Sequence, residues 1–236
     1  MRFHLLAILA CFVAFSTSAS LRAQEKKDDP IAKVRLAAAR TQSANNLKQI
    51  ALAFHIGADA NGEFPRDITD KNGKPLLSWR VAILPYIEQA ALYKQFKLDE
   101  PWDSANNKPL SEIVIKVYTA PRGKFEKGYT VYQSFSGDGA LMNGKALKFN
   151  QITDGTSNTF MVIEAGEAVP WSKPADVAFD AKKPLPKLGG IFDGDFNVAF
   201  CDGSVRFVKN GVKEDILKKY ITIAGGEAIG AKDLEP

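Results

Sequence analysis

The chain of 236 residues carries 31 Lys and Arg against 27 Asp and Glu, which gives a formal net charge of +4. The length suits one large domain or two small ones, and 45% hydrophobic with 25% charged residues is typical of a globular protein rather than a disordered one. The small charge argues against a dedicated nucleic-acid binder, and two His and two Cys leave little room for His-based catalysis, zinc sites or a disulfide framework.

Residues 1–23 have the pattern of a secretory signal peptide. Arg2 supplies the positive charge, and an apolar run too short to span a membrane is followed by small residues. We expect cleavage after Ala23, with Ala19 as the alternative site. An uncleaved anchor is less favoured because the apolar run is weak, and so is a lipoprotein attached at Cys11, because the stretch before it is very short. The sequence therefore predicts export to the periplasm, the cell surface or the medium.

Cleavage would change the charge and the reactive side chains of the protein. Loss of Arg2 and Arg22 lowers Lys and Arg from 31 to 29, so the net charge against 27 Asp and Glu falls to +2. The mature chain keeps only Cys201 and His55, so it can form no intrachain disulfide and its fold must rest on the hydrophobic core. With the signal removed, we expect no membrane span.

The first predicted element after the signal is a long helix. Residues 24–30 are charged and lack bulky apolar side chains, which indicates a flexible leader. Apolar side chains then recur at helical spacing through residues 31–58, starting with Ile31 and Val34, and predict one amphipathic helix. We expect this helix to end at Gly57 and at the Asn-Gly pair of residues 61–62.

A second helix is predicted at residues 79–96. Ser78 has the character of its N-cap, and Pro85 should bend the helix or split it into two pieces. The polar stretch at 100–110 that follows predicts a loop in which Trp102 is an aromatic anchor.

The remainder of the chain has strand-like segments separated by turn residues. Residues 201–204 predict a tight turn between two strands, residues 173–190 a long surface loop, and residues 214–220 a short terminal helix. Because helices precede strands, the pattern predicts an α+β fold with an antiparallel sheet. We expect residues 31–236 to form a single domain. The predicted strands are residues 113–120, 129–135, 160–165, 197–201 and 204–208.

His55 and Cys201 are the reactive side chains of the mature protein. His55 could act as a general base or metal ligand, but it has no evident partner in the sequence, and we favour a polar residue at a helix end. Cys201 could be a nucleophile only with a base such as His55, and we favour a small buried hydrophobe. The sequence therefore designates no catalytic residue.

Aromatic and acidic side chains give two further candidate sites. Trp79, Trp102 and Trp171, with Asp103, could line a ligand-stacking surface, although pinning long loops to the core is the favoured role of two of the three Trp. A carboxylate pair for glycoside hydrolysis would need two acidic side chains to converge, and surface charge is the favoured interpretation. The candidate carboxylates are Glu88, Glu100, Asp103, Glu164 and Glu167.

Oxygen-bearing side chains at alternate positions suggest a metal site. Asp193, Asp195 and Asn197 are spaced like the start of an EF-hand loop, which would bind Ca²⁺. Val198 and Ser204 stand where that loop needs Gly and Glu, so a turn leading into a strand is favoured. Residues 152–159 have the residue types of a phosphate loop without its Lys and spacing, and a hydrogen-bonded turn is again favoured. We therefore expect no cofactor, with Ca²⁺ as the one alternative.

Several stretches in order along the mature chain resemble one large family. The resemblance is to the planctomycete-type proteins that carry domain of unknown function 1559, also labelled a bacterial solute-binding family. The stretches are residues 45–50 (NNLKQI) with His55, 62–65 (GEFP), 78–89 (SWRVAILPYIEQ) with 92–93 (LY), 100–104 (EPWDS), 152–159 (ITDGTSNT), 169–171 (VPW) and 196–207 (FNVAFCDGSVRF).

The resemblance implies a pseudopilin-like fold, with the long N-terminal helix packed on an antiparallel sheet, and no established activity. Members commonly begin with a prepilin-type segment whose apolar helix anchors in the membrane and drives filament assembly. This chain has only the amphipathic second half of that helix, which counts against pilus-like polymerisation. Members also commonly carry a His where this chain has Phe192.

Together these observations predict an exported, non-enzymatic, structural or interaction protein. We expect an unidentified protein or glycan partner at the cell envelope and no nucleic-acid partner. The alternative is an extracytoplasmic solute- or glycan-binding protein whose site is lined by the three Trp and nearby carboxylates. A carboxylate-based hydrolase is a third, less favoured hypothesis.

Overall fold

The computed structural model describes residues 29–227 and 229–235, and the chain divides into two units after Thr41. The predicted signal peptide (1–23) and most of the predicted leader (24–30) lie outside these residues. The described part of the first unit consists mainly of the opening turns of helix α2 (Pro30–Asn61). Ile31 and Val34 lie in these turns and are 60% and 68% exposed, so this part of the predicted apolar stripe is not buried.

The predicted long helix is confirmed as α2, although Gly57 does not end it. In the second unit its buried face includes Leu47, Ile50 and Phe54. Gly57 belongs to the same face because the chain after the helix passes very close to it. A Cβ atom at this position would come within 2.8 Å of Pro65 Cγ, which is why a residue without a side chain is required inside the helix.

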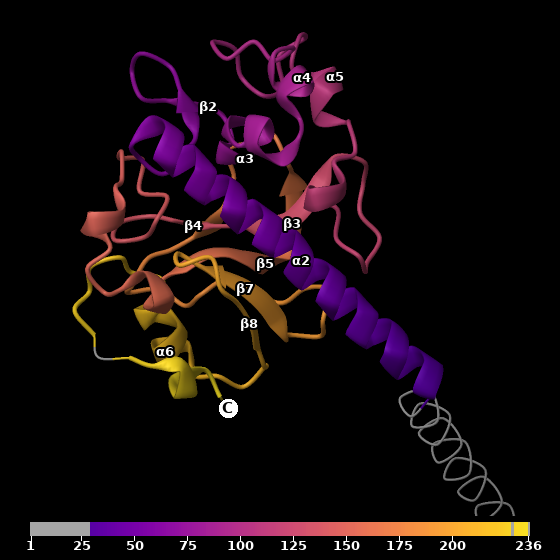
Figure 1. Cartoon of the computed structure of the whole chain (residues 1–236), viewed down its shortest axis with the longest axis vertical. Helices are drawn as coiled ribbons and strands as arrows, with labels where there is room; N and C mark the ends of the chain where they lie inside the picture. Colours follow the sequence, from indigo (N-terminus) through magenta and orange to yellow (C-terminus); the bar gives the residue numbers. More distant parts are fainter. Residues whose placement is uncertain (1–28, 228, 236) are drawn as a thin grey trace, which may run out of the picture. The chain divides into compact units, whose positions relative to one another are not determined.

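A four-stranded antiparallel sheet forms the centre of the second unit (Figure 1). Its strands are β3 (Tyr129–Gln133), β5 (Phe160–Pro170), β7 (Phe196–Phe200) and β8 (Val205–Val208), in the order β3-β5-β7-β8. The strands predicted at 129–135, 160–165, 197–201 and 204–208 are thereby confirmed, and β5 is longer than predicted. The chain has an α+β fold.

Two small sheets flank this centre. β1 (Ile68–Thr69) pairs antiparallel with β2 (Pro75–Leu77), and β4 (Phe135–Ser136) pairs parallel with β6 (Val177–Ala178). The short helices not described below are α5 (Lys108–Ser111), η3 (Phe149–Gln151), η4 (Thr156–Asn158) and η5 (Ala231–Leu234).

The centre of the main sheet is buried on both faces because helical segments cover each of them, whereas most of β8 and the second half of β5 are less buried. Successive strand residues point to opposite faces, so Phe196 and Val198 lie on the face opposite Asn197. The phenylalanine face packs in one hydrophobic cluster with Leu217 of α6 (Glu214–Lys219), the predicted terminal helix. Helix α2, from Gln42 onward, packs on the opposite face, where Asn197 and the polar side chains described below lie. Every residue of β7 is accordingly buried.

The turn between β7 and β8 has the geometry that the sequence predicts. The backbone N–H of Gly203 donates to the carbonyl of Phe200, and the N–H of Phe200 donates to the carbonyl of Ser204. Gly203 has a φ of 84°, the left-handed conformation that a three-residue hairpin loop requires at this position. This turn fixes the register in which Ala199 pairs with Val205.

The predicted second helix is split into three short pieces, α3 (Trp79–Ala82), η1 (Leu84–Ile87) and α4 (Ala90–Tyr93). Ser78 is the N-cap of α3, as predicted, and its hydroxyl accepts a hydrogen bond from the N–H of Arg80. Pro85 lies in the first turn of η1, where its ring and missing N–H end the preceding helix. The left-handed residue Glu88, with a φ of 62°, ends η1.

The strand predicted at 113–120 is wrong. This segment is a loop that contains the single turn η2 (Lys116–Tyr118), in which the N–H of Tyr118 donates to the carbonyl of Ile115. The turn buries the Tyr118 ring and lets its hydroxyl donate to the carbonyl of Arg80, 2.8 Å away. Separately, no helix among the described residues is long and apolar enough to cross a bilayer.

Candidate functional site

A buried carboxylate, Glu164 of β5, lies at the contact between α2 and the sheet. The hydroxyl of Ser43 on α2 donates to its Oε1, while Asn197 on β7 donates its backbone N–H to Oε2 at 2.6 Å and its side-chain amide to Oε1 at 2.9 Å. The hydroxyl of Tyr132 lies 2.7 Å from Ser43 Oγ and accepts from Asn46 Nδ2 at 3.1 Å. Burial raises the pKa of Tyr132 to about 12. Because a buried carboxylate is stable only with such donors, this cluster fixes α2 on the sheet.

A second buried cluster is centred on Arg80 and Asp176. The Arg80 guanidinium donates to Asp176 Oδ1 at 2.8 Å and to the carbonyl of Tyr132 at 2.8 Å. Asp176 also accepts from the Trp79 indole at 3.0 Å and from the backbone N–H of Ser134 at 2.8 Å. The side chains of Arg80 and Asp176 are 0% and 2% exposed. The pair therefore joins α3 to the main sheet, because the guanidinium and the carboxylate bond both to each other and to neighbouring groups.

Asp67 lies beside this cluster and has a raised pKa. Its Oδ1 accepts from the backbone N–H of Trp79 at 2.8 Å. Burial, and next the negative charge of Asp176, raise the pKa of Asp67 to about 6. Sequence reasoning missed this carboxylate pair because the two residues lie in unrelated loops, and neither stands in a motif.

The three Trp side chains of the predicted ligand site have different surroundings. Trp79 and Trp171 are 0% and 1% exposed, so their rings are covered by protein. The Trp171 indole donates to the carbonyl of Ile113 at 3.0 Å, which pins the 113–118 loop. Trp102 is half-buried with the Lys173 ammonium 5.7 Å from its ring, and Asp103 beside it is exposed. Only Trp102 and Asp103 of this set reach the surface.

The carboxylates considered for hydrolysis have different surroundings. Glu164 is held in the buried cluster, whereas Glu88, Asp103 and Glu167 are exposed. Both carboxylate oxygens of Glu100 accept from Asn106 Nδ2, at 2.9 and 3.0 Å. These hydrogen bonds lower the pKa of Glu100, which works against a role as general acid.

The residues of the predicted metal site are engaged with three different partners. Asp193 has a φ of 59° in a turn and lies 3.4 Å from the Arg122 guanidinium. Asp195 Oδ1 accepts from the backbone N–H of Asn210, and Asn197 donates to Glu164. Among the described residues no group of three or more His, Cys, Asp or Glu side chains is placed to hold a metal ion.

His55 and Cys201 both lie near the turn between β7 and β8. The His55 ring stacks on Phe149 at 5.1 Å, and a Cβ atom on Gly203 would lie 3.5 Å from its Nε2. That nitrogen is buried and has no hydrogen-bond partner within the described structure. Cys201 is fully buried, and burial raises the pKa of its thiol, which opposes the thiolate that a nucleophile needs.

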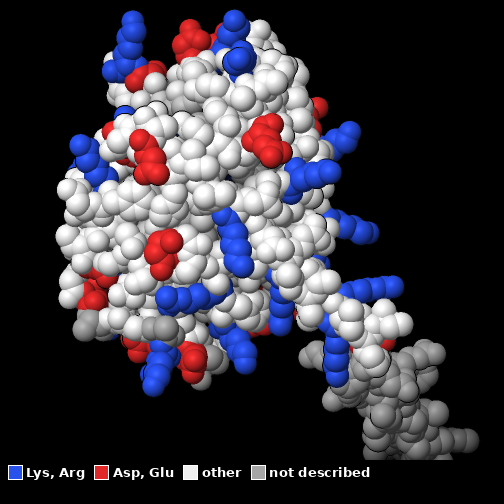
Figure 2. Space-filling model, in the orientation of Figure 1, with Lys and Arg blue, Asp and Glu red and all other residues white. Residues whose placement is uncertain are grey.

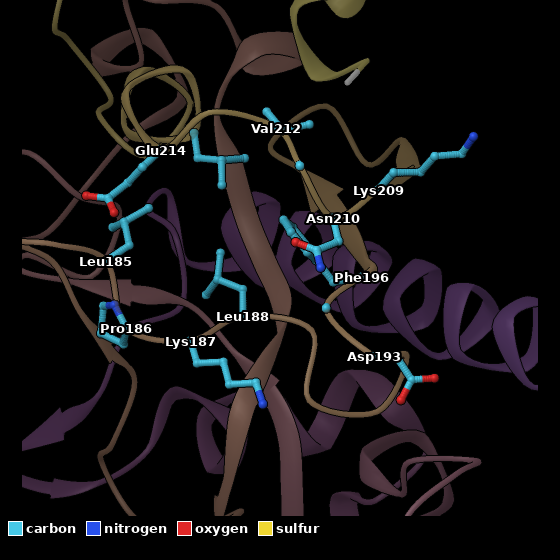
Figure 3. A pocket seen from close by; sticks show the side chains of 13 residues that line it. Leu185, Pro186, Lys187, Leu188, Asp193, Phe196, Lys209, Asn210, Val212 and Glu214 are labelled. Atoms are coloured by element: carbon cyan, nitrogen blue, oxygen red, sulfur yellow. The ribbon is translucent and has the colours of Figure 1, made fainter. Parts of the chain in front are cut away.

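Two cavities lie at the surface of the second unit. Of the candidate residues discussed above, Asp193 lines the first and Glu88 lines the second. A cavity of about 600 Å³ lies at the end of β8, between residues 185–188, the turn at 209–212 and α6 (Figure 3). A groove of about 570 Å³ runs between α2, the η1 segment and residues 114–117. Their residues come from segments far apart in the chain and belong to no motif, so the sequence carries no signal for either.

The groove beside α2 exposes aliphatic side chains. Leu52 of α2 is 60% exposed and Val114 is 54% exposed, and both line the groove. In contrast, charged side chains form no dominant patch on the face in Figure 2, where Lys and Arg are scattered among Asp, Glu and uncharged residues. The groove therefore combines exposed aliphatic side chains with the polar side chains of Gln49, Glu88, Gln89 and Lys116.

Comparison with known proteins places the chain in a family without a described activity. The family model described as "Protein of unknown function (DUF1559)" matches residues 32–186. No curated protein matches the chain, and no solved structure matches it. The matched region covers nearly all of α2 and all of β3 and β5, and it ends before nearly all of the residues that line the cavity at the end of β8.

Proposed function

The chain belongs to the DUF1559 family, a family of unknown function, and we propose that this member is an exported, non-enzymatic interaction protein of pseudopilin-like build. It acts in the periplasm, at the cell surface or outside the cell, where it binds another protein of the envelope. The long helix on an antiparallel sheet supports the pseudopilin-like part of the proposal.

The groove beside α2 is the observation that carries this proposal. Leu52 and Val114 expose aliphatic side chains across a concave surface of about 570 Å³, next to Ile56, which is 41% exposed. Exposed apolar side chains grouped at a groove are typical of sites that receive an apolar segment of a partner protein. The expected occupant is a protein segment that inserts one or two aliphatic side chains.

The state of the reactive side chains supports a non-enzymatic role. Glu164 and the Arg80–Asp176 pair use their polar atoms to join elements of the fold, and the pKa of the Cys201 thiol is raised by burial. A catalytic group needs a free polar atom directed toward a substrate. Robust hydrolase or redox turnover by the purified secreted protein would contradict the proposal.

Site-specific crosslinking tests the groove. A photoreactive phenylalanine replaces Leu52 in the native host, and the matched control replaces Phe125, which is 42% exposed and does not line the groove. We expect one discrete adduct from position 52, none of that mass from position 125, and loss of the adduct when Val114→Asp is added. Equal adducts from both positions, or an adduct that Val114→Asp leaves unchanged, would contradict a docking role for the groove.

Intact mass spectrometry of the secreted protein tests export separately. Cleavage after Ala23 predicts a product that begins at Gln24. A cell-associated chain of full mass would contradict the free, exported form.

A second candidate function is supported by the cavity at the end of β8. Its volume of about 600 Å³ lies in the range of small-molecule sites, and both apolar and charged side chains line it. This supports a solute-binding role at a place other than the Trp residues. Ligand-induced increases in melting temperature would test this role in general.

A further inference from the structure

We propose that the cavity at the end of β8 binds a small amphipathic carboxylate, with its aliphatic part on the cavity floor and its carboxylate between Lys187 and Lys209. The proposal rests on the second candidate function above and is independent of the groove beside α2. It assigns a ligand class to a cavity formed almost entirely by residues beyond the region that defines the family.

The floor of the cavity is apolar. Phe196 of β7 and Leu217 of α6 are buried and line it. The half-buried side chain of Leu188 also lines it, and Figure 3 shows Leu188 and Phe196. Removing an aliphatic chain from water against such a floor contributes roughly 0.8 kcal/mol for each buried CH₂ group. Among the described residues that line the cavity, Phe196 is the aromatic one, so it supplies a single aromatic face.

The charge at the cavity favours an anion. Its two acidic side chains are already matched, because Glu214 lies 2.9 Å from Lys218 and Asp193 lies 3.4 Å from Arg122. The ammonium groups of Lys187 and Lys209, by contrast, form no hydrogen bond or ion pair within the part of the chain that the structure describes. The charge left for a ligand is therefore that of two lysines, which lie at the margins of the cavity (Figure 3).

A polar group between the two lysines could orient the head of the ligand. The side-chain amide of Asn210 has no hydrogen bond to any described residue, and its backbone is fixed because the N–H donates to Asp195 Oδ1 at 2.9 Å. Its amide nitrogen lies 2.7 Å from where a Cβ atom on Gly194 would be, so the glycine makes room for it. The amide offers a donor to a carboxylate oxygen. The exposed side chains of Lys187 and Lys209 extend away from Asn210 in Figure 3, so they would turn toward the carboxylate when it binds.

Binding of octanoate to the purified secreted protein tests this assignment. Heteronuclear NMR titrations would compare octanoate with acetate, which keeps the charge, and with 1-octylamine and 1-octanol, which keep the chain. We expect saturable shifts for residues around Leu188, Val212 and Asn210 with octanoate, and at least tenfold weaker binding of the three other probes. If octylamine or octanol bound as tightly as octanoate, the ligand would not need a carboxylate. If acetate bound as tightly as octanoate, the ligand would not need an aliphatic chain. Either result would overturn the proposal.

Variants locate the head group. Lys187→Gln with Lys209→Gln should weaken octanoate binding about tenfold, since two partly exposed charge contacts are lost. Asn210→Ala should weaken it about threefold. The matched control is Lys182→Gln with Lys145→Gln, two exposed lysines outside the cavity, which should leave binding unchanged.

Two results separate failure of this inference from failure of the solute-binding role. Octanoate binding that the Lys187/Lys209 variant leaves intact overturns the inference. If none of the four probes shifts a residue of the cavity but another solute does, the solute-binding role stands and the carboxylate assignment falls. If no solute raises the melting temperature or shifts the cavity residues, both are overturned.

Discussion

The guanidinium of Arg80 and the carboxylate of Asp176 lie 2.8 Å apart with side-chain exposures of 0% and 2%. Arg80 comes from the first turn of α3 and Asp176 from the loop before β6, so one buried ion pair joins two distant parts of the chain. An arginine cannot lose its proton in a protein interior, and its charge must therefore be matched where it is buried.

Removing the Asp176 carboxylate should strongly destabilise the protein. In Asp176→Ala the Arg80 charge stays buried without its partner, and the Trp79 indole and Ser134 N–H lose their acceptor. We expect the free energy of unfolding in urea to fall by about 3–5 kcal/mol. Asp180→Ala is the control, since that exposed carboxylate pairs with Lys183 at the surface and its loss should have a much smaller effect. Equal destabilisation by both variants would show that burial of the Arg80 pair is not decisive.

Asp67 should give the protein an unusual pH dependence. Its pKa in the folded state is about 6 against an ordinary value of 3.8, so the folded state holds this proton more tightly than the unfolded state. Its contribution to stability is therefore full below about pH 4 and is lost as the pH rises to about 6, by roughly 1–3 kcal/mol. Asp67→Asn keeps an acceptor for the Trp79 N–H but has no carboxyl group that could take up a proton.

Urea denaturation between pH 4 and 7 measures this difference. The stability of Asp67→Asn relative to the unsubstituted protein should rise as the pH increases from 4 to 6 and then level off. Asp59→Asn, which changes an exposed carboxylate of α2, should show no such trend. Parallel stability curves for Asp67→Asn and the unsubstituted protein would contradict the raised pKa.

The hydroxyl of Tyr132 should contribute to the seating of α2. Tyr132→Phe removes the group that bonds Ser43 and Asn46, and should lower the free energy of unfolding by about 1–2 kcal/mol. Amide hydrogen exchange should accelerate in the second half of α2, because local opening of the helix becomes less costly. Tyr129→Phe on the same strand is the control. If this variant also accelerated amide exchange in the second half of α2, the result would argue against a specific role of the buried cluster.

The Cys201 thiol should be unreactive in the native state. Burial removes access and raises its pKa, so an aromatic disulfide reagent should modify it only as fast as the protein opens. The rate should increase steeply with urea. In a Cys201→Ala background, Asp202→Cys places a thiol at the neighbouring exposed position and should react at once in buffer. Rapid modification of Cys201 without denaturant would contradict the burial of this residue.

The elements that the sequence predicts well are those whose cause is local. Helix α2 follows from apolar residues at helical spacing, the end of α3 from Pro85, and the turn after β7 from a glycine at the one position that needs a positive φ. The segment 113–120 fails because its β-branched residues favour a strand, whereas burial of Tyr118 requires a turn there. A strand also needs a neighbour to pair with, and that neighbour is set by the whole chain.

The sequence by itself determined the family, the fold class, the long helix and most strands, because periodicity, turn residues and recognisable stretches are properties of neighbouring positions. Only the tertiary structure decided which polar groups meet. It paired Arg80 with Asp176, gave Asp67 a raised pKa beside them and buried Glu164 under α2. It also placed Lys187 and Lys209 at the margins of a cavity with an apolar floor. Distances between residues far apart in the chain, and the loss of water around them, exist only once the sheet and its helices have packed.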